Sequence, residues 1–67
     1  MLPPHAESLG FDSFYAGLDP GDRVRHPSKP DWGIGQVQSV VGARVTVNFE
    51  NVGKLLINAR QVTLERV

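Results

Sequence analysis

The stretch WGIGQVQSVVGARVTVNFE, residues 32–50, decides the fold of this chain. Apolar and polar side chains alternate on both sides of the dipeptide Gly42-Ala43, and a period of two residues is typical of strands with one buried face. The inward positions are Val37, Ser39 and Val41 before the dipeptide and Val45, Val47 and Phe49 after it. We therefore predict an antiparallel hairpin of strands 36–41 and 44–49, joined by a tight turn.

Turn signals on both sides of this hairpin indicate three further strands. The sequence DPGD, residues 19–22, favours a type II turn because Pro presets φ at the first central position and Gly accepts the positive φ of the second. A strand over residues 22–26 should follow it. Residues 50–53 form the next turn, and strands are expected over 54–57 and 62–67. Five short, evenly spaced strands predict an all-β domain, a small five-stranded antiparallel barrel.

The connections between these strands differ in character. The prolines of residues 27–31 interrupt any ladder and predict a stiff exposed loop. Gly33 and Gly35 then suggest a bulge or a bend where another strand or side chain passes close to the backbone. Residues 58–61 are too few for an ordinary helix and predict a loop or a single 3₁₀ turn.

The expected core is small and entirely apolar. A chain of 67 residues forms one domain and cannot divide its core. The candidate core residues are Val24, Ile34, Val37, Val41, Val45, Val47, Phe49, Leu55, Ile57, Val62, Leu64 and Val67. Because there is no cysteine, no disulfide supplements this core. Stability should be marginal, and a partner or a second subunit would add to it, so both a monomer and a homodimer remain open.

Residues 1–18 are expected to form an arm attached to the barrel of residues 19–67. Pro3 and Pro4 favour an extended leader. Apolar side chains follow at i, i+3, i+4 and i+7, which is one face of a short amphipathic helix, and these are Phe11, Phe14, Tyr15 and Leu18. So short a helix is unstable alone in water. The stripe therefore either covers an open side of the barrel or docks on another protein.

A net charge of zero conceals two blocks of opposite sign. Residues 1–20 contain three acidic side chains and no Lys or Arg, whereas residues 21–67 contain seven basic and four acidic side chains, a net charge of +3. This balance is far below that of dedicated nucleic-acid binders. The N-terminus has no signal-peptide pattern, and no apolar run approaches the roughly 18 residues of a membrane span. We expect a soluble cytoplasmic protein.

The strongest candidate for recognition is the region where charge, prolines and the single tryptophan meet. Its candidate partner-binding residues are Arg23, Arg25, His26, Lys29, Trp32 and Ile34. The cationic members could attract a phosphate backbone, or they could be a solvated face balanced by Asp22 and Asp31. Trp32 could cap one end of the barrel or project as an interface anchor.

No pattern in the sequence indicates catalysis. His5 and His26 are far apart and lack the paired carboxylates of a metal site, and no serine has the context of a nucleophile. The Gly-Ile-Gly of residues 33–35 lacks the third glycine, the lysine and the helix of a phosphate-binding loop. We expect a non-enzymatic protein with no cofactor and no metal.

Several segments together carry a family resemblance. These are GDRVRHP at 21–27, WGIGQVQSV at 32–40, VTVNFENVGKLLI at 45–57 and LERV at 64–67. The pattern resembles the small Tudor-like or SH3-like domain at the C-terminus of UvrD-type bacterial DNA helicases. It looks even closer to a family of uncharacterised small bacterial proteins that consist of little more than that domain. In the helicases an apolar or aromatic residue and Gly-x-Gly directly follow the His, whereas residues 27–31 intervene here.

The resemblance implies an SH3/Tudor-like barrel and a role in recognition. The helicase domain is similar to small modules that contact RNA polymerase. We therefore expect a protein-interaction module, an adaptor that docks on transcription or DNA-repair machinery, with RNA polymerase as the first candidate partner. One alternative is a weak, salt-dependent nucleic-acid-binding protein. Another is a small structural subunit that docks into a larger assembly through its N-terminal aromatic stripe.

Overall fold

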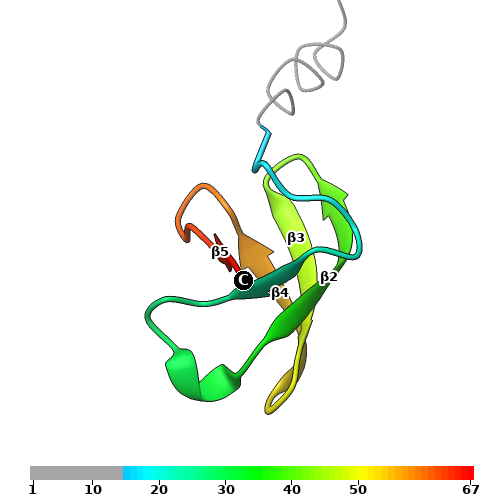
Figure 1. The fold of residues 1–67 in the computed structure, drawn as a ribbon. Helices are drawn as coiled ribbons and strands as arrows, with labels where there is room; N and C mark the ends of the chain where they lie inside the picture. Colours follow the sequence, from blue (N-terminus) through cyan, green and yellow to red (C-terminus); the bar gives the residue numbers. More distant parts are fainter. Residues whose placement is uncertain (1–14) are drawn as a thin grey trace, which may run out of the picture.

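A computed structural model describes residues 15–67 of the chain, which form one antiparallel sheet (Figure 1). Its elements are β1 (Arg23–Arg25), the 3₁₀ turn η1 (Pro30–Trp32), β2 (Gly35–Val41), β3 (Arg44–Phe49), β4 (Gly53–Asn58) and β5 (Glu65–Arg66). The predicted all-β, five-stranded antiparallel fold is confirmed. Within the described residues there is no α-helix, and so no helix that is long and apolar enough to cross a membrane.

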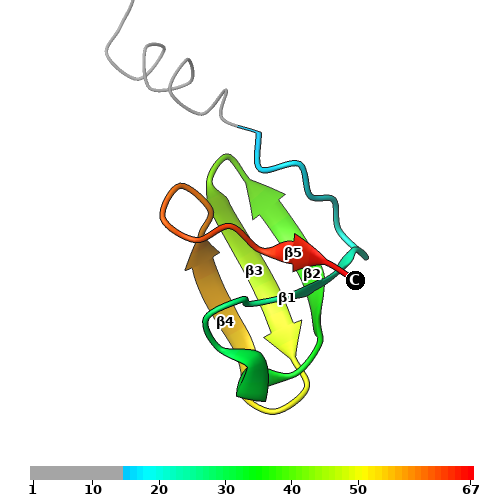
Figure 2. The same ribbon diagram turned by 60° about the vertical axis from the view of Figure 1, so that its left-hand side comes forward.

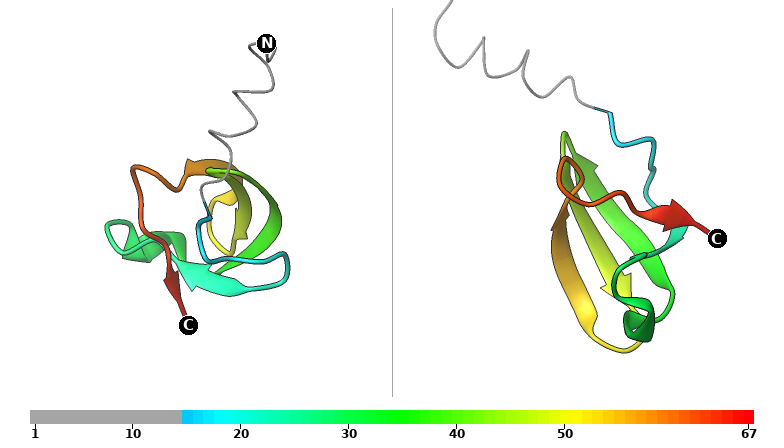
Figure 3. Two further views of the ribbon diagram at one scale, coloured as in Figure 1. Left: turned by 90° about the horizontal axis from the view of Figure 1, so that it is seen from above. Right: turned by 90° about the vertical axis from the view of Figure 1, so that its left-hand side faces the viewer.

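The sheet curls without closing its ladder. Its strand order is β4-β3-β2-β1-β5, so β4 and β5 are the two edges and do not pair with each other. Figure 2 shows β1 and β5 crossing in front of β2 and β3, and the view from above shows the strands surrounding a common interior (Figure 3). The predicted barrel is therefore open, because the two-residue β5 pairs only with β1 and leaves one side of β4 without a neighbour.

The expected turns lie where the sequence places them. The N–H of Asp22 donates to the carbonyl of Asp19 over 3.0 Å, and Gly21 has φ of 95°, as a type II turn requires. Val41 pairs with Arg44 across the two-residue loop, which confirms the central hairpin. The predicted final strand is shorter than expected, because only Glu65–Arg66 pairs with β1.

A β-bulge in β2 decides which of its valines is buried. The register with β3 shifts between Val37 and Ser39, so one extra residue is inserted into β2. Beyond the bulge Val40 packs against the core, whereas Val41 is 65% exposed. The prediction that Val37, Ser39 and Val41 share the inward face is wrong after Val37, because strict alternation does not allow for the inserted residue.

The core lies inside the curl of the sheet. Its buried members are Leu18, Val24, Val37, Val45, Val47, Phe49, Ile57 and Leu64. Ile34 is only half-buried and Val67 is 62% exposed, so both were wrongly predicted as core residues. Val67 lies outside because it follows the last paired residue of the sheet. Leu18, the last residue of the predicted N-terminal stripe, also packs in this core, as a stripe that covers the barrel would require of it.

Gly35 is required by a close approach between strands. A Cβ atom at this position would lie 2.4 Å from Cγ1 of Val47 and 2.8 Å from Cδ1 of Phe49, both side chains of β3. The predicted close passage at this bend is therefore confirmed. The aromatic ring of Phe49 occupies the space that any larger residue would need.

Candidate interaction surface

The basic cluster seen in the sequence is divided by the fold. Arg23 and Arg25 are both exposed on the outer face of β1, as predicted. Nε of Arg25, however, donates to Oε1 of Glu65 over 2.8 Å, since the two residues are partners in the β1/β5 register. Lys29 is exposed in the loop before η1, and Arg23 and Lys29 form no ion pair within residues 15–67. This part of the surface is a mixture of charges.

His26 belongs to the interior and not to the exposed patch. Its side chain is buried, and its Nδ1 accepts a hydrogen bond of 3.2 Å from the N–H of Ser28. Its ring packs edge-on against Trp32, with the centroids 4.9 Å apart, and Trp32 packs in the same way on Phe49 at 5.2 Å. Trp32 therefore caps the core through this row of three rings, which is the first of its two predicted roles.

The loop that carries Trp32 and Ile34 is tied to the turn between β3 and β4. The N–H of Ile34 donates to Oε1 of Glu50 over 2.9 Å, and the N–H of Glu50 donates to the carbonyl of Ile34 over 3.0 Å. Asn51 donates from Nδ2 to the carbonyl of Asp31 over 2.9 Å and from its backbone to that of Trp32 over 3.1 Å. These bonds fix the conformation of the loop against the turn. Glu50 and Asn51 read in the sequence only as turn residues.

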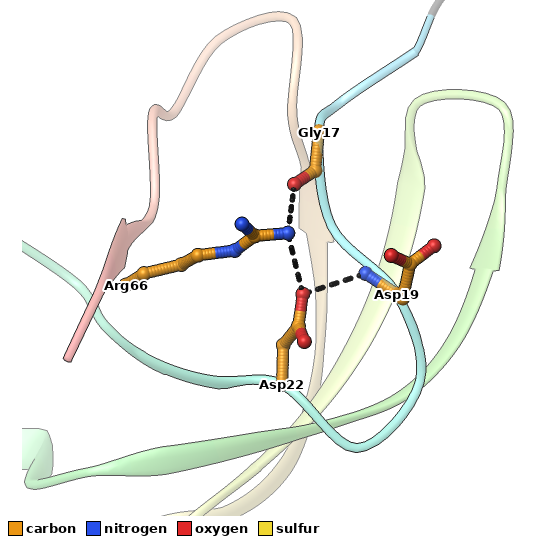
Figure 4. Close-up of polar contacts among 4 residues, drawn as sticks. All are labelled: Gly17, Asp19, Asp22 and Arg66. Carbon is orange, nitrogen blue, oxygen red and sulfur yellow. Dashed lines mark hydrogen bonds and ion pairs between the residues drawn. The ribbon is translucent and has the colours of Figure 1, made fainter.

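Arg66 joins the end of the sheet to the segment that enters it (Figure 4). Its Nη2 donates to the carbonyl of Gly17 over 2.7 Å and to Oδ2 of Asp22 over 2.9 Å. The same Oδ2 accepts the N–H of Asp19 over 2.8 Å. The Asp19 hydrogen bond, helped by the Arg66 guanidinium and opposed by partial desolvation, holds the pKa of Asp22 below its ordinary value. Asp22 is thus the anchor at which the two chain segments meet.

We predict that Arg66→Gln lowers stability at neutral pH and that this loss becomes smaller in acid, where only the bond of Arg66 to the Gly17 carbonyl remains to be lost. Because the folded-state pKa of Asp22 is lowered, its carboxylate stabilises the fold above the unfolded-state pKa, and this contribution is lost as pH falls through the folded-state value. Urea denaturation of both proteins between pH about 7 and 2 measures the effect. Asp22→Asn is the control, and its stability should change less with pH than that of the wild type. Parallel pH profiles of wild type and Arg66→Gln would contradict the prediction.

The N-terminal stripe is only partly within the described residues. Phe11 and Phe14 lie outside them. Tyr15 is 70% exposed, whereas Leu18 is 5% exposed and packs in the core. Residues 15–18 are not helical, and Gly17 has φ of 77°, so the expected helical face does not extend over them. Leu18 therefore acts as part of the sheet domain.

The edge strand β4 has six residues, and only β3 pairs with it. The N–H of Ala59 donates to the carbonyl of Ala43, which continues the ladder between β3 and β4. Since hydrogen-bonded residues alternate along an antiparallel strand, Leu55 and Ile57 direct their backbone groups to β3, and Lys54 and Leu56 direct theirs outward. Leu56 is also 66% exposed on the outer face of the sheet. An edge of this kind can accept a further strand.

A shallow hollow of about 450 Å³ adjoins this edge. Its lining residues are Val41, Ala43, Arg44, Leu56, Ile57, Asn58 and Arg60. Two exposed apolar side chains, Val41 and Leu56, form part of it, two guanidinium groups border it, and no carboxylate lines it. We name the edge of β4 together with this hollow the β4 surface. The sequence did not indicate this surface. Val41 was assigned to the core, and no pattern in the sequence places Arg44, on β3, beside Leu56, on β4.

The geometry defines a small, open antiparallel sheet domain with a free edge and an adjoining basic and apolar hollow. Among residues 15–67 no group of three His, Cys, Asp or Glu residues could hold a metal ion.

The family model that describes a protein of unknown function, DUF3553, matches residues 18–67, so the chain belongs to the DUF3553 family. No curated protein and no solved structure matches the chain significantly.

Proposed function

We propose that this protein is a non-enzymatic interaction module that docks on transcription or DNA-repair machinery, with RNA polymerase as the first candidate partner. The observation that carries the proposal is the β4 surface. Addition of a partner strand at a sheet edge supplies backbone hydrogen bonds for affinity, and side-chain pockets next to the edge supply specificity. The outward backbone groups of Lys54 and Leu56 meet the first requirement, and the hollow beside Val41 meets the second.

The resemblance to the Tudor-like domain of UvrD-type helicases supports the choice of partner. That domain is similar to modules that contact RNA polymerase. The segment in which this chain departs from the helicase pattern, residues 27–31, includes the start of η1, and the loop that follows is tied to Glu50 and Asn51. Those contacts hold this loop against the turn between β3 and β4, and we place the proposed binding site on the β4 surface.

Nucleic-acid binding is supported less well by the same geometry. Arg25 is paired with Glu65 and His26 is buried, so the cationic run of the sequence does not form one continuous patch. Binding of single strands usually relies on bases stacked on exposed aromatic rings, and Trp32 packs against the core. Direct binding of nucleic acid is therefore an outcome to be tested.

We predict that the immobilised full chain retains RNA polymerase or a repair protein from a bacterial lysate and that Leu56→Pro loses it. Proline removes the outward N–H donor of residue 56, and edge strands accommodate proline where that N–H faces solvent. Leu56→Ala is the matched control, because it removes the side chain and keeps the donor. Mass spectrometry identifies the retained proteins, and circular dichroism checks that both variants fold.

The three baits give distinguishable results. If strand addition holds the partner, the wild type should retain most of it, Leu56→Ala less, and Leu56→Pro least. Equal retention by all three baits would remove the β4 surface from the proposal. Recovery of neither a polymerase subunit nor a repair protein by the wild-type bait would count against the adaptor role itself.

A further inference from the structure

We infer that the β4 surface selects an acidic extended segment in which an apolar residue is flanked, two positions away on each side, by carboxylates. The inference rests on the proposed function, and it adds the chemistry of the partner. It follows from the spacing of the backbone groups on β4 and from the charges beside them.

The outer face of β4 and its neighbours fixes the side-chain pattern of an incoming strand. Lys54, Leu56 and Asn58 share this face, with Arg44 directly opposite Asn58 on β3. A strand added to β4 would pair with Lys54 and Leu56 and end beside Asn58, whose carbonyl already accepts the N–H groups of Gln61 and Val62. Its alternate residues would lie next to these three positions, because side chains on paired strands face each other across the ladder. The central residue of the incoming strand would lie beside Leu56. The residues two positions before and after it would lie beside Lys54 at one end and beside Asn58 and Arg44 at the other.

Charge complementarity selects carboxylates for the two outer positions. Arg44 and Lys54 are exposed and form no ion pair within residues 15–67. The carboxylates of the described chain lie in other places: Asp19 and Asp22 before β1, Asp31 in η1, Glu50 bound to the Ile34 N–H, and Glu65 on β5. No carboxylate of residues 15–67 lines the hollow beside Arg44. Opposite charges facing each other across a strand pair are stabilising, and like charges are destabilising.

The same charges disfavour a second copy of this chain as the occupant. Pairing of two β4 strands about a twofold axis at Leu56 would bring Lys54 and Arg44 of both copies to one interface without a carboxylate. Lysine on an edge strand is a known protection against such self-pairing. The apolar contribution of Leu56 and Val41 likewise suits a peptide better than a phosphate backbone.

The test uses the full chain and two fluorescein-labelled synthetic peptides of matched length. The acidic peptide TETVTET carries the inferred pattern, and TKTVTKT replaces both carboxylates by ammonium groups. Anisotropy should show at least about tenfold weaker binding of the basic peptide, with a difference that shrinks as salt is added. Amide chemical shifts in a ¹⁵N-labelled sample should change most at Lys54, Leu56 and Arg44. Equal binding of both peptides, or binding of neither, would overturn the inference.

Charge reversal on the protein gives a second and independent reading. The double variant Arg44→Glu with Lys54→Glu should invert the preference and favour the basic peptide. Arg23→Glu with Lys29→Glu changes the net charge by the same amount on β1 and its following loop, and it should leave the preference for the acidic peptide in place. The inference is overturned if both double variants act alike, since net charge alone would then explain the result.

Two further arms separate this inference from its competitors and from the proposed function. Tighter binding of a single-stranded oligonucleotide than of TETVTET, or a dimer in light scattering that the peptide dissociates, would replace the inferred occupant. A partner that is retained by the bait with Arg44→Glu and Lys54→Glu but lost by Leu56→Pro would leave the adaptor role standing and reject the acidic chemistry. If TETVTET binds but the wild-type bait recovers no polymerase or repair protein, the acidic chemistry stands and the adaptor role is rejected.

Discussion

Replacement of Phe49 by alanine is expected to unfold the domain. Phe49 is 2% exposed, fills the space above Gly35, and carries the ring against which Trp32 packs with the centroids 5.2 Å apart. Loss of a buried Phe side chain costs about 3–5 kcal/mol, because the removed atoms and the remaining cavity both contribute. A domain of this size has a total stability of the same order, roughly 0.05–0.15 kcal/mol per residue. Little native protein should remain at 25 °C.

Trp32 provides a direct readout of this change. It is the single tryptophan of the chain, and it lies between His26 and Phe49. Its fluorescence and the near-ultraviolet circular dichroism should both lose their native signal in Phe49→Ala. Phe49→Leu, which keeps most of the apolar volume, should fold and show a lower urea midpoint than the wild type. A Phe49→Ala protein with a native spectrum and an unchanged urea midpoint would show that this ring does not organise the core.

Gly35→Ala is expected to destabilise the fold by about 1–3 kcal/mol through overpacking. The new methyl group would lie 2.4 Å from Cγ1 of Val47 and 2.8 Å from the Phe49 ring, both of which are buried and cannot move away freely. Urea denaturation of the variant measures the loss directly. A stability equal to the wild type would mean that β2 and β3 can separate at this point without cost.

A double variant separates overpacking from a general intolerance of alanine. Val47→Ala removes the atom nearest to the new methyl group, so Gly35→Ala should cost less in the Val47→Ala background than in the wild type. Coupling between residues in contact is commonly about 0.5–3 kcal/mol. Strict additivity of the two substitutions would contradict the close approach. Val47→Ala is itself destabilising, and its own cost is subtracted in the double-variant cycle.

Binding at the β4 surface, as we propose it, needs no catalytic residue. An open ladder leaves backbone donors and acceptors at Lys54 and Leu56, and the bulge in β2 turns Val41 outward beside them. The same feature that keeps the sheet from closing thus creates the surface to which we assign binding. This link between fold and proposed function is local, since it depends on residues 41–60.

The local sequence was sufficient for the elements that short-range chemistry controls. Alternation of apolar residues indicated the hairpin of β2 and β3, and DPGD at 19–22 indicated a type II turn, because side-chain period and allowed φ values are properties of neighbouring residues. The close approach at Gly35 was also predictable, since glycine in a strand commonly marks such a position. These features establish the all-β class and the order of its strands along the chain.

Tertiary structure alone decided which of the candidate residues remain at the surface. The inserted residue in β2 exposed Val41, pairing of β1 with β5 joined Arg25 to Glu65, and packing against Trp32 buried His26. Each of these outcomes depends on contacts between segments that are distant in the chain, or on a register that alternation cannot reveal. The sequence by itself therefore determined the strands and turns, and the fold determined which charges and apolar groups are left for a partner.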